Sequence, residues 1–472
     1  MFFRSRSGYL PVASSPPQLK WKHKIRQFVS RRALRLLPLV VFVLGTIAWY
    51  FLLPRLPTLN TILPPLYQEY RDREDSLPHY EPDATYPNGR HAKYVFFANH
   101  LQGVGWGNLM QELLLNALLA YKAKRSFVFY NYEWKPGSRY AIYDFRIIPA
   151  TVPLSAILSG PLTGGPIDSA DVPRAVSVNH FREICPNRTI VSGDELRAQL
   201  QSATGLQTLT ALTRKLEAME DRCIEISLKT LQAFDYYLLG SKDVLDIWPT
   251  LSESPIITQF DWSPLIHSAF NTNRKLFETS SPHFSAPSDT FKPFMPSPHI
   301  SGLLAVHLRR GDFKKHCDML AKWSSGFNGF NRFDELPDKF QIPPGGWGEN
   351  TPENIETYHR HCYPSISQIV DKVLDVRRKV PGLDRLYIMT NGDEKWMQEL
   401  TSALETLEEW KSISSSQDLI LTWEQKFVAP ALDIYVAQSA QAFIGNGWSS
   451  LTSNSVMLRM AGKHNPNTTF FW

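Results

Sequence analysis

The sequence predicts an α/β protein built from two Rossmann-like halves that face a cleft. Strand and helix patterns alternate through the last third of the chain, and a strand, glycine-rich loop, helix and second strand follow one another near residue 100. A Pro/Ser-rich stretch, residues 280–299, separates these two regions and predicts a linker. Such alternation produces mostly parallel sheets with helices on both faces. We therefore expect one half over residues 92–295 and the other over residues 300–472.

The first half opens with a βαβ unit. KYVFFAN (93–99) is an apolar run that predicts a buried strand, and HLQGVGWGN (100–108) is a glycine-bearing turn. A helix is expected over 108–124, where apolar residues recur at helical spacing, and SFVFYNY (126–132) predicts the next strand. Beyond residue 150 the pattern weakens, with one charged amphipathic helix expected over roughly 194–229.

The second half alternates more clearly. The expected strands cover residues 303–308, 385–390, 418–423 and 442–446. The expected helices cover residues 365–380, 394–407, 431–441 and 450–462. An excursion rich in Trp, Phe, Gly and Pro, residues 317–363, interrupts the alternation after the first strand.

The N-terminus carries the excess positive charge. Residues 1–35 hold nine of the 50 Lys and Arg residues and no Asp or Glu, which leaves 41 basic and 45 acidic residues in the remainder. The body is therefore slightly acidic, which argues against nucleic-acid binding. Residues 36–53 form an uncharged run that can span a hydrocarbon core of about 30 Å. The arginines just before it favour a cytosolic N-terminus.

These features predict a single-pass type II membrane protein of the Golgi or endoplasmic reticulum, with a lumenal body. A cleaved signal peptide is the alternative, but the segment before the apolar run is long and small residues at a cleavage site are missing. Residues 54–91 are rich in Pro, Tyr and charge without a persistent period, which predicts a stem.

Four cysteines and two glycosylation sequons follow the apolar run. An even number of cysteines suits two disulfides in the lumen, with three possible pairings. The cysteines are Cys185, Cys223, Cys317 and Cys362, and the sequons begin at Asn187 and Asn467.

Three polar clusters follow predicted strands directly. They are HLRRGDF (307–313), TNGD (390–393) and GNGWSS (445–450). Ligands of parallel α/β sheets bind at the carboxyl ends of strands, so neighbouring strands would bring these clusters into one cleft. Paired arginines grip phosphate oxygens, and a helix N-terminus offers N–H groups to the same oxygens.

Together the clusters indicate a nucleotide diphosphate site. Asn391, Asp393 and Asp433 could accept hydrogen bonds from a ribose or a base. Neither a P-loop nor a GxGxxG fingerprint is present, and the glycine loop reads GxGxG.

Simpler interpretations exist for each cluster. HLRRGDF also suits a solvated strand end, GVGWGN a tight turn and GNGWSS a helix cap. The RGD tripeptide suggests adhesion, which would need an exposed loop tip rather than the end of a core strand. His100, His316, His359 and His361 are interpreted as ordinary polar surface, because no HExxH or DxD motif accompanies them.

Taken in order, these segments resemble the GDP-fucose-dependent fucosyltransferases of the protein O-fucosyltransferase and α1,6-fucosyltransferase superfamily. The resemblance is carried by residues 103–132, 307–313, 386–393 and 432–459. It implies a GT-B fold, GDP-fucose as donor, inversion at the sugar carbon and no required metal or other cofactor. It also implies that Arg309 contacts the donor diphosphate, with His307 and Arg310 beside it and Asp312 as the acid of the motif.

Further donor-side positions follow from the resemblance: Gly103, Gly105, Gly107, Asn108, Asp433, Ser449 and Ser450. One branch of the superfamily uses a glutamate in the glycine loop as catalytic base, whereas this sequence has Val104 there. The base therefore stays open between Asp312, which alternatively holds Arg310, and the leaving phosphate. Arg309 is expected to stabilise charge on the leaving diphosphate.

The expected reaction is transfer of fucose to a glycan or protein acceptor. The excursion over 317–363 is expected to form part of the acceptor wall, closed by a disulfide between Cys317 and Cys362. The rival interpretations are the same fold with another nucleotide sugar, and a non-catalytic lumenal receptor that retains the fold.

Overall fold

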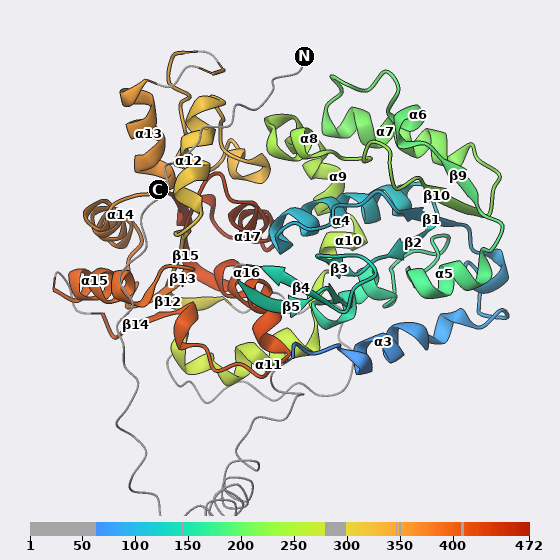
Figure 1. The fold of residues 1–472 in the computed structure, drawn as a ribbon, viewed down its shortest axis with the longest axis horizontal. Helices are drawn as coiled ribbons and strands as arrows, with labels where there is room; N and C mark the ends of the chain where they lie inside the picture. Colours follow the sequence, from blue (N-terminus) through green and yellow to red (C-terminus); the bar gives the residue numbers. More distant parts are fainter. Residues whose placement is uncertain (1–62, 144, 279–298, 346, 349–350, 407–409) are drawn as a thin grey trace, which may run out of the picture. The chain divides into compact units, whose positions relative to one another are not determined.

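The computed structural model describes residues 63–472 except 144, 279–298, 346, 349–350 and 407–409. The predicted cytosolic tail (1–35), the predicted membrane segment (36–53) and nearly all of the predicted linker lie outside the described residues. Within the described ranges, no helix is long and apolar enough to cross a membrane. Residues 63–472 form one compact unit with two five-stranded parallel sheets (Figure 1).

The first sheet lies within the predicted first half. In spatial order its strands are β8 (Val176–Ser177), β2 (Ser126–Phe129), β1 (Tyr94–Phe97), β10 (Cys223–Ile226) and β9 (Thr189–Val191). Every neighbouring pair is parallel. All four residues of β1 are buried, because a central parallel strand is covered on both faces. Phe181 packs on Tyr94 and Phe96 from one face.

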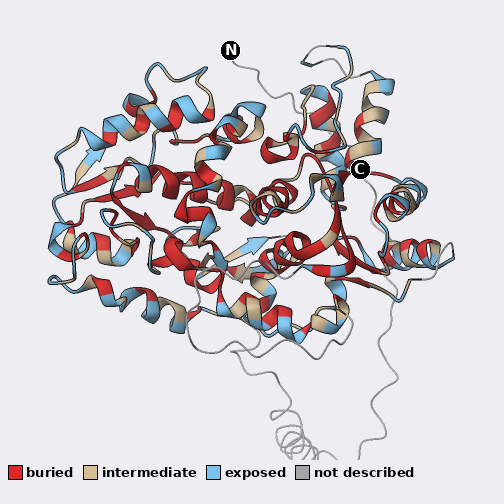
Figure 2. Ribbon diagram, turned by 180° about the vertical axis from the view of Figure 1, so that it is seen from behind, coloured by how far each residue is buried: buried red, intermediate tan, exposed pale blue. Residues whose placement is uncertain are grey.

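Helix α4 (Trp106–Lys122) follows β1 through the glycine loop, as the βαβ pattern predicted. Fourteen of its residues are buried, from Trp106 to Ala120, so it is a core helix rather than an amphipathic surface helix. It is among the most completely buried elements in Figure 2.

Smaller elements complete the first half. Three antiparallel pairs are β3 (Tyr132–Glu133) with β6 (Thr151–Val152), β4 (Tyr140–Tyr143) with β5 (Arg146–Pro149), and β7 (Leu158–Ser159) with β11 (Asp261–Trp262). The helices are α5 (Val178–Ile184), α6 (Gly193–Arg197), α7 (Gly205–Glu217), α8 (Tyr236–Gly240), α9 (Trp248–Ser252), α10 (Pro255–Thr258) and α11 (Pro264–Thr272).

The single helix expected over 194–229 is wrong. The structure divides this stretch into α6, α7 and strand β10. Thr204 and Gln207 form a capping box that starts α7 anew, and Cys223–Ile226 pairs between β1 and β9 as a sheet strand. Charged residues lie between α7 and β10, so the sequence pattern of a charged amphipathic helix continues across the break between them.

The second sheet contains the three strands that carry the polar clusters. In spatial order it consists of β14 (Ser412–Ser415), β13 (Arg385–Thr390), β12 (Ile300–Leu308), β15 (Ala440–Gly445) and β16 (Thr469–Phe471). All neighbouring pairs are parallel. The helices of this half are α12 (Phe313–Lys322), α13 (Pro352–Cys362), α14 (Ile366–Lys379), α15 (Glu394–Glu405), α16 (Ala429–Ser439) and α17 (Ser450–Ala461).

Alternate residues of these strands belong to two separate cores. Leu304 and Val306 of β12 pack with buried side chains of α14 and α15. Leu303 and Ala305 lie on the other face, in a core that also contains α16, α4 and the first sheet. The period of two along a strand produces this division. The two predicted halves thus each contain one five-stranded parallel sheet, and a continuous core joins them.

The strand expected over 418–423 is also wrong, because the edge strand is β14, six residues earlier. Residues 419–423 form a loop in which the Asn273 side chain takes the place of a neighbouring strand. Its Nδ2 donates to the Ile420 carbonyl at 2.9 Å, and its Oδ1 accepts from the Ile420 N–H at 2.7 Å. The apolar run LIL therefore packs without ladder pairing.

Residues 63–91 of the predicted stem are folded, and its residues 54–62 lie outside the described residues. Helix α3 (Gln68–Asp75) and two 3₁₀ turns, Pro78–Tyr80 and Gly89–His91, occupy this stretch and pack on the body. Glu74 is buried and its Oε1 accepts from the Ser155 N–H at 2.8 Å. His79 is buried as well, with Nε2 2.8 Å from the Ala175 carbonyl. Long-range partners, not a local period, order this segment.

Two disulfides connect the four cysteines. The structure joins Cys317 to Cys362, the pairing predicted from the sequence, and Cys185 to Cys223. The first ties α12 to the end of α13 and so closes the excursion over 317–363. The sequon residues Asn187 and Asn467 are both exposed.

Candidate functional site

The three polar clusters meet at one edge of the second sheet. Strands β13, β12 and β15 are neighbours, and each ends in one cluster. The Arg310 N–H donates to Asn391 Oδ1 at 2.7 Å, and Asn391 Nδ2 donates to the Arg310 carbonyl at 3.2 Å. His307 Nδ1 lies 2.9 Å from Thr452 Oγ1, which links β12 to α17.

The glycine loop of the first half reaches the same edge. A Cβ placed on Gly107 would lie 2.7 Å from both the backbone nitrogen of Leu451 and Oγ of Ser450, so α4 and α17 touch through this glycine. Asn454 Nδ2 donates to the Gly107 carbonyl at 2.8 Å, and Gln111 Nε2 donates to Ser453 Oγ at 2.5 Å. The contact therefore joins elements that follow strands of the two different sheets.

Two helix N-termini face this contact. Gly105 is the N-cap of α4 and has no side chain to hydrogen-bond the first turn, and the side chain of Ser449, the N-cap of α17, makes no such bond either. Each N-terminus has N–H groups without intrahelical acceptors and a partial positive charge. Bringing two such ends together is unfavourable unless negative charge lies beside them, so the arrangement suits an anion such as a diphosphate.

Arg309 is the charged side chain that the end of β12 presents at this edge. It is about one-third exposed (32%), and one guanidinium nitrogen lies 3.2 and 3.3 Å from the two carboxylate oxygens of Asp312. Asp312 itself is 66% exposed and stands at the start of α12. The carboxylate thus orients Arg309 and leaves part of the guanidinium open to a ligand.

Arg310 does not share this exposure. Its guanidinium lies between the rings of Tyr363 and Trp396, 4.4 and 4.2 Å from their centroids, and Nη2 donates to the Pro364 carbonyl at 2.5 Å. Burial lowers the pKa of this arginine. The structure therefore places Arg310, expected beside the donor, in a buried stack that fastens the end of the excursion to the sheet.

His307 is also buried. Burial lowers its pKa to about 3, so the imidazole is neutral. Thr452 Oγ1 accepts from the Asn446 N–H at 3.1 Å, so its own proton is available to His307 Nδ1. The ring proton then resides on Nε2. His307 positions α17 against the strand that carries Arg309.

The acidic and amide candidates are engaged by protein groups. The Asn391 side chain is used by the Arg310 backbone, and Asp393 Oδ1 caps α15 by accepting from the Trp396 N–H at 2.9 Å. Asp433 accepts from the Tyr387 hydroxyl at 2.9 Å, and burial raises its pKa to about 7. These contacts shape the edge of the sheet around Arg309.

A backbone hydrogen bond to strand β3 fixes the start of the glycine loop. Gly103, in the left-handed region at φ +67°, donates its N–H to the Glu133 carbonyl at 2.8 Å. A Cβ on Gly105 would have no heavy atom within 4 Å, so this residue borders open space. Asn108 lies in the first turn of α4 and is partly buried.

Sequence reasoning missed Glu112, a buried carboxyl beneath the loop. Its Oε2 accepts from the Leu101 N–H at 2.7 Å, and burial raises its pKa to about 8. Hydrogen bonds from Leu101 and Asn116 act to lower the pKa of Glu112, so burial is the cause that dominates. One glutamate within a run of apolar helical residues was the available signal.

The histidines interpreted from the sequence as polar surface differ in burial and in their partners. His100, interpreted as surface, is buried and stacks on Tyr130 with centroids 3.7 Å apart. His359 Nε2 lies 2.6 Å from Asp318, and His361 Nδ1 lies 2.5 Å from the Trp472 carbonyl. Among the described residues, no three His, Cys, Asp or Glu side chains are grouped as a metal site requires.

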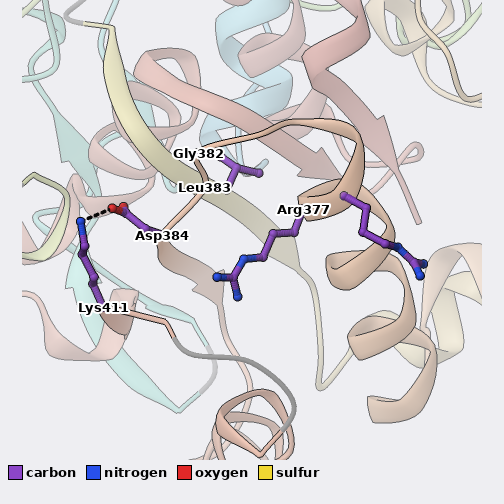
Figure 3. Close-up of a pocket in the computed structure, with 6 residues that line it drawn as sticks. Arg377, Gly382, Leu383, Asp384 and Lys411 are labelled. Atoms are coloured by element: carbon purple, nitrogen blue, oxygen red, sulfur yellow. Dashed lines mark ion pairs between the residues drawn. The ribbon is translucent and has the colours of Figure 1, made fainter.

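A separate cavity of about 470 Å³ lies at the opposite edge of the second sheet, just before β13 begins (Figure 3). Arg377 points toward it, and Lys411 pairs with Asp384 at 2.6 Å. Since the clusters stand at the other ends of these strands, this cavity is distinct from the candidate site.

Part of the chain matches a known protein family, and the fold is similar to that of a solved structure. Residues 249–460 match the family described as GDP-fucose protein O-fucosyltransferase. The structure is similar to that of POFUT1 in complex with GDP-fucose, with a TM-score of 0.50 and 14% identity over 80% of this chain and 98% of that one. NodZ α1,6-fucosyltransferase soaked with GDP-fucose gives a TM-score of 0.37 and 10% identity, over 78% and 92% of the two chains. No curated protein sequence matches this chain.

Proposed function

We propose that this chain is a glycosyltransferase that transfers fucose from GDP-fucose to a glycan or protein hydroxyl, with inversion at the sugar carbon and without a required metal. The observation that carries the proposal is the meeting of two uncapped helix N-termini, α4 and α17, at the sheet edge where Arg309 stands. The match of residues 249–460 to GDP-fucose protein O-fucosyltransferases supports fucose as the sugar.

The mechanism follows from where charge develops. As the bond from fucose C1 to the phosphate oxygen breaks, negative charge builds on the leaving GDP. Preorganised donors at that position stabilise the transition state more than the ground state. Arg309, oriented by Asp312, and the first-turn N–H groups of the two helices supply such donors.

The cellular setting is part of the proposal. We infer that residues 36–53 anchor the chain as a type II membrane protein and that its body lies in the lumen of the Golgi or endoplasmic reticulum. The two disulfides, Cys185–Cys223 and Cys317–Cys362, support an oxidising compartment.

The test is GDP release from GDP-fucose by the full-length protein in detergent, together with thermal stabilisation by GDP, UDP and ADP. We expect GDP to stabilise the protein most. Arg309→Ala should reduce GDP release by about 10²–10³-fold, the usual loss on removing one transition-state donor. Stabilisation by UDP or ADP in place of GDP would contradict the donor, and near-normal GDP release by the variant would contradict the role of Arg309.

A further inference from the structure

The structure places a titratable side chain one helical turn after Asp312. Helix α12 begins at Phe313, and His316 lies four residues beyond Asp312, the spacing that puts two side chains on the same face of a helix. Asp312 in turn pairs with Arg309. Arg309, Asp312 and His316 therefore form a row that leads from the diphosphate position along α12.

The surroundings of His316 favour a neutral, accessible imidazole. The residue is partly buried and its ring packs on Phe313, with centroids 4.9 Å apart. Burial lowers its pKa from 6.5; Asp312 acts to raise it and Arg309 to lower it. On α13, the helix packed against α12, His359 pairs with Asp318 instead.

The other titratable groups near this edge are buried or already bonded to protein groups, so they are not available to take a proton from an acceptor. His307, His100 and Glu112 are buried, and Asp433 is held by Tyr387 and Ser416. Asp312 is engaged with Arg309, where its negative charge is needed to orient the guanidinium. Within the described residues, His316 is the group beside Arg309 that combines partial exposure with a basic atom that no protein hydrogen bond is seen to occupy.

We propose that His316 is the general base that takes the proton from the acceptor hydroxyl. This rests on the proposed function and assigns the base that the glycine loop, with Val104, does not supply. The acceptor oxygen forms a bond to fucose C1 while the bond from C1 to the phosphate oxygen breaks. The electron pair leaves with GDP, and the hydroxyl proton passes to the unprotonated ring nitrogen of His316, which later releases it to solvent.

The test uses GDP-fucose with water as the acceptor, so no other acceptor is needed. His316→Gln in the full-length protein should lower GDP release by about 10²–10⁴-fold, the loss typical of removing a general base. Lys314→Gln is the matched control, because Lys314 is exposed and lies about 160° round the helix from His316. Thermal stabilisation by GDP should be the same in both variants, which shows that each folds and binds.

The pH profile separates a base from a structural residue. Wild-type GDP release should fall as the pH drops below the pKa of His316, and His316→Gln should lack this fall. A loss smaller than tenfold, or an unchanged acid limb, would overturn the role of His316. If the wild type binds GDP but releases none from GDP-fucose, the proposed function fails, and the inference with it.

Discussion

Replacing Gly107 by alanine tests whether the contact between α4 and α17 is as close as the structure shows. Gly107 occupies the first turn of α4, where alanine ordinarily stabilises a helix by about 0.5–1 kcal/mol relative to glycine. The added Cβ would lie 2.7 Å from Leu451 N and 2.9 Å from the carbonyl carbon of Ser450. Both are backbone atoms, so α17 has to move.

Overpacking of this kind costs about 1–3 kcal/mol. Subtracting the middle of the helix-propensity range from the middle of the overpacking range, we expect Gly107→Ala to lower the free energy of unfolding by roughly 1.3 kcal/mol. The measurement is urea unfolding of the full-length protein in detergent, followed by tryptophan fluorescence. GDP should also stabilise this variant less than the wild type, because the two helix ends are pushed apart.

Gly105→Ala is the control in the same loop. Its Cβ meets no atom within 4 Å and its φ of −65° suits any residue. Alanine is a poorer N-cap than glycine, but it also reduces the entropy of the unfolded chain by a similar amount, so the free energy of unfolding should stay within about 0.5 kcal/mol of wild type. If Gly107→Ala proves as stable as this control, the close helix contact is wrong.

Two further predictions concern buried charge. Glu112→Gln should stabilise the protein increasingly as pH rises from 4.5 to 8. The free energy of unfolding of the wild type falls between pH 4.5 and 8, because the carboxyl ionises in the unfolded chain before it ionises in the folded protein, where burial raises its pKa to about 8. The glutamine variant has no such group and shows no such fall. The difference in unfolding free energy should grow by up to about 1.4 kcal/mol per pH unit, and a pH-independent difference would contradict a protonated Glu112. Arg310→Lys should lower stability by about 1–3 kcal/mol, because an ammonium cannot stack between Tyr363 and Trp396, yet keep GDP stabilisation near wild type. Lost GDP stabilisation with unchanged urea stability would restore Arg310 to the donor site.

The difference between Arg309 and Arg310 shows how far sequence reasoning reached. HLRRGDF after an apolar strand predicted a polar edge, and the structure confirms that its neighbours there are the TNGD and GNGWSS segments. The motif could not distinguish the two arginines. Adjacent side chains at a strand end diverge, and the rings that bury Arg310 come from Tyr363 and Trp396, 53 and 86 residues later in the sequence.

Two local errors had the same cause. The helix over 194–229 and the strand over 418–423 were inferred from local periodicity. Partners distant in sequence decided both segments: the β1 and β9 strands pair with β10, and Asn273 binds the loop after β14.

The sequence by itself determined the central strands β1, β2, β12, β13 and β15, the strand ends that carry the clusters and the glycine loop, because buried parallel strands and their turns have local signatures. Only the tertiary structure decided that the first turns of α4 and α17 meet at Gly107 and that Arg309 is open while Arg310 is stacked. Those outcomes depend on which distant side chains enclose a group, and the energy of a charge is set by that enclosure.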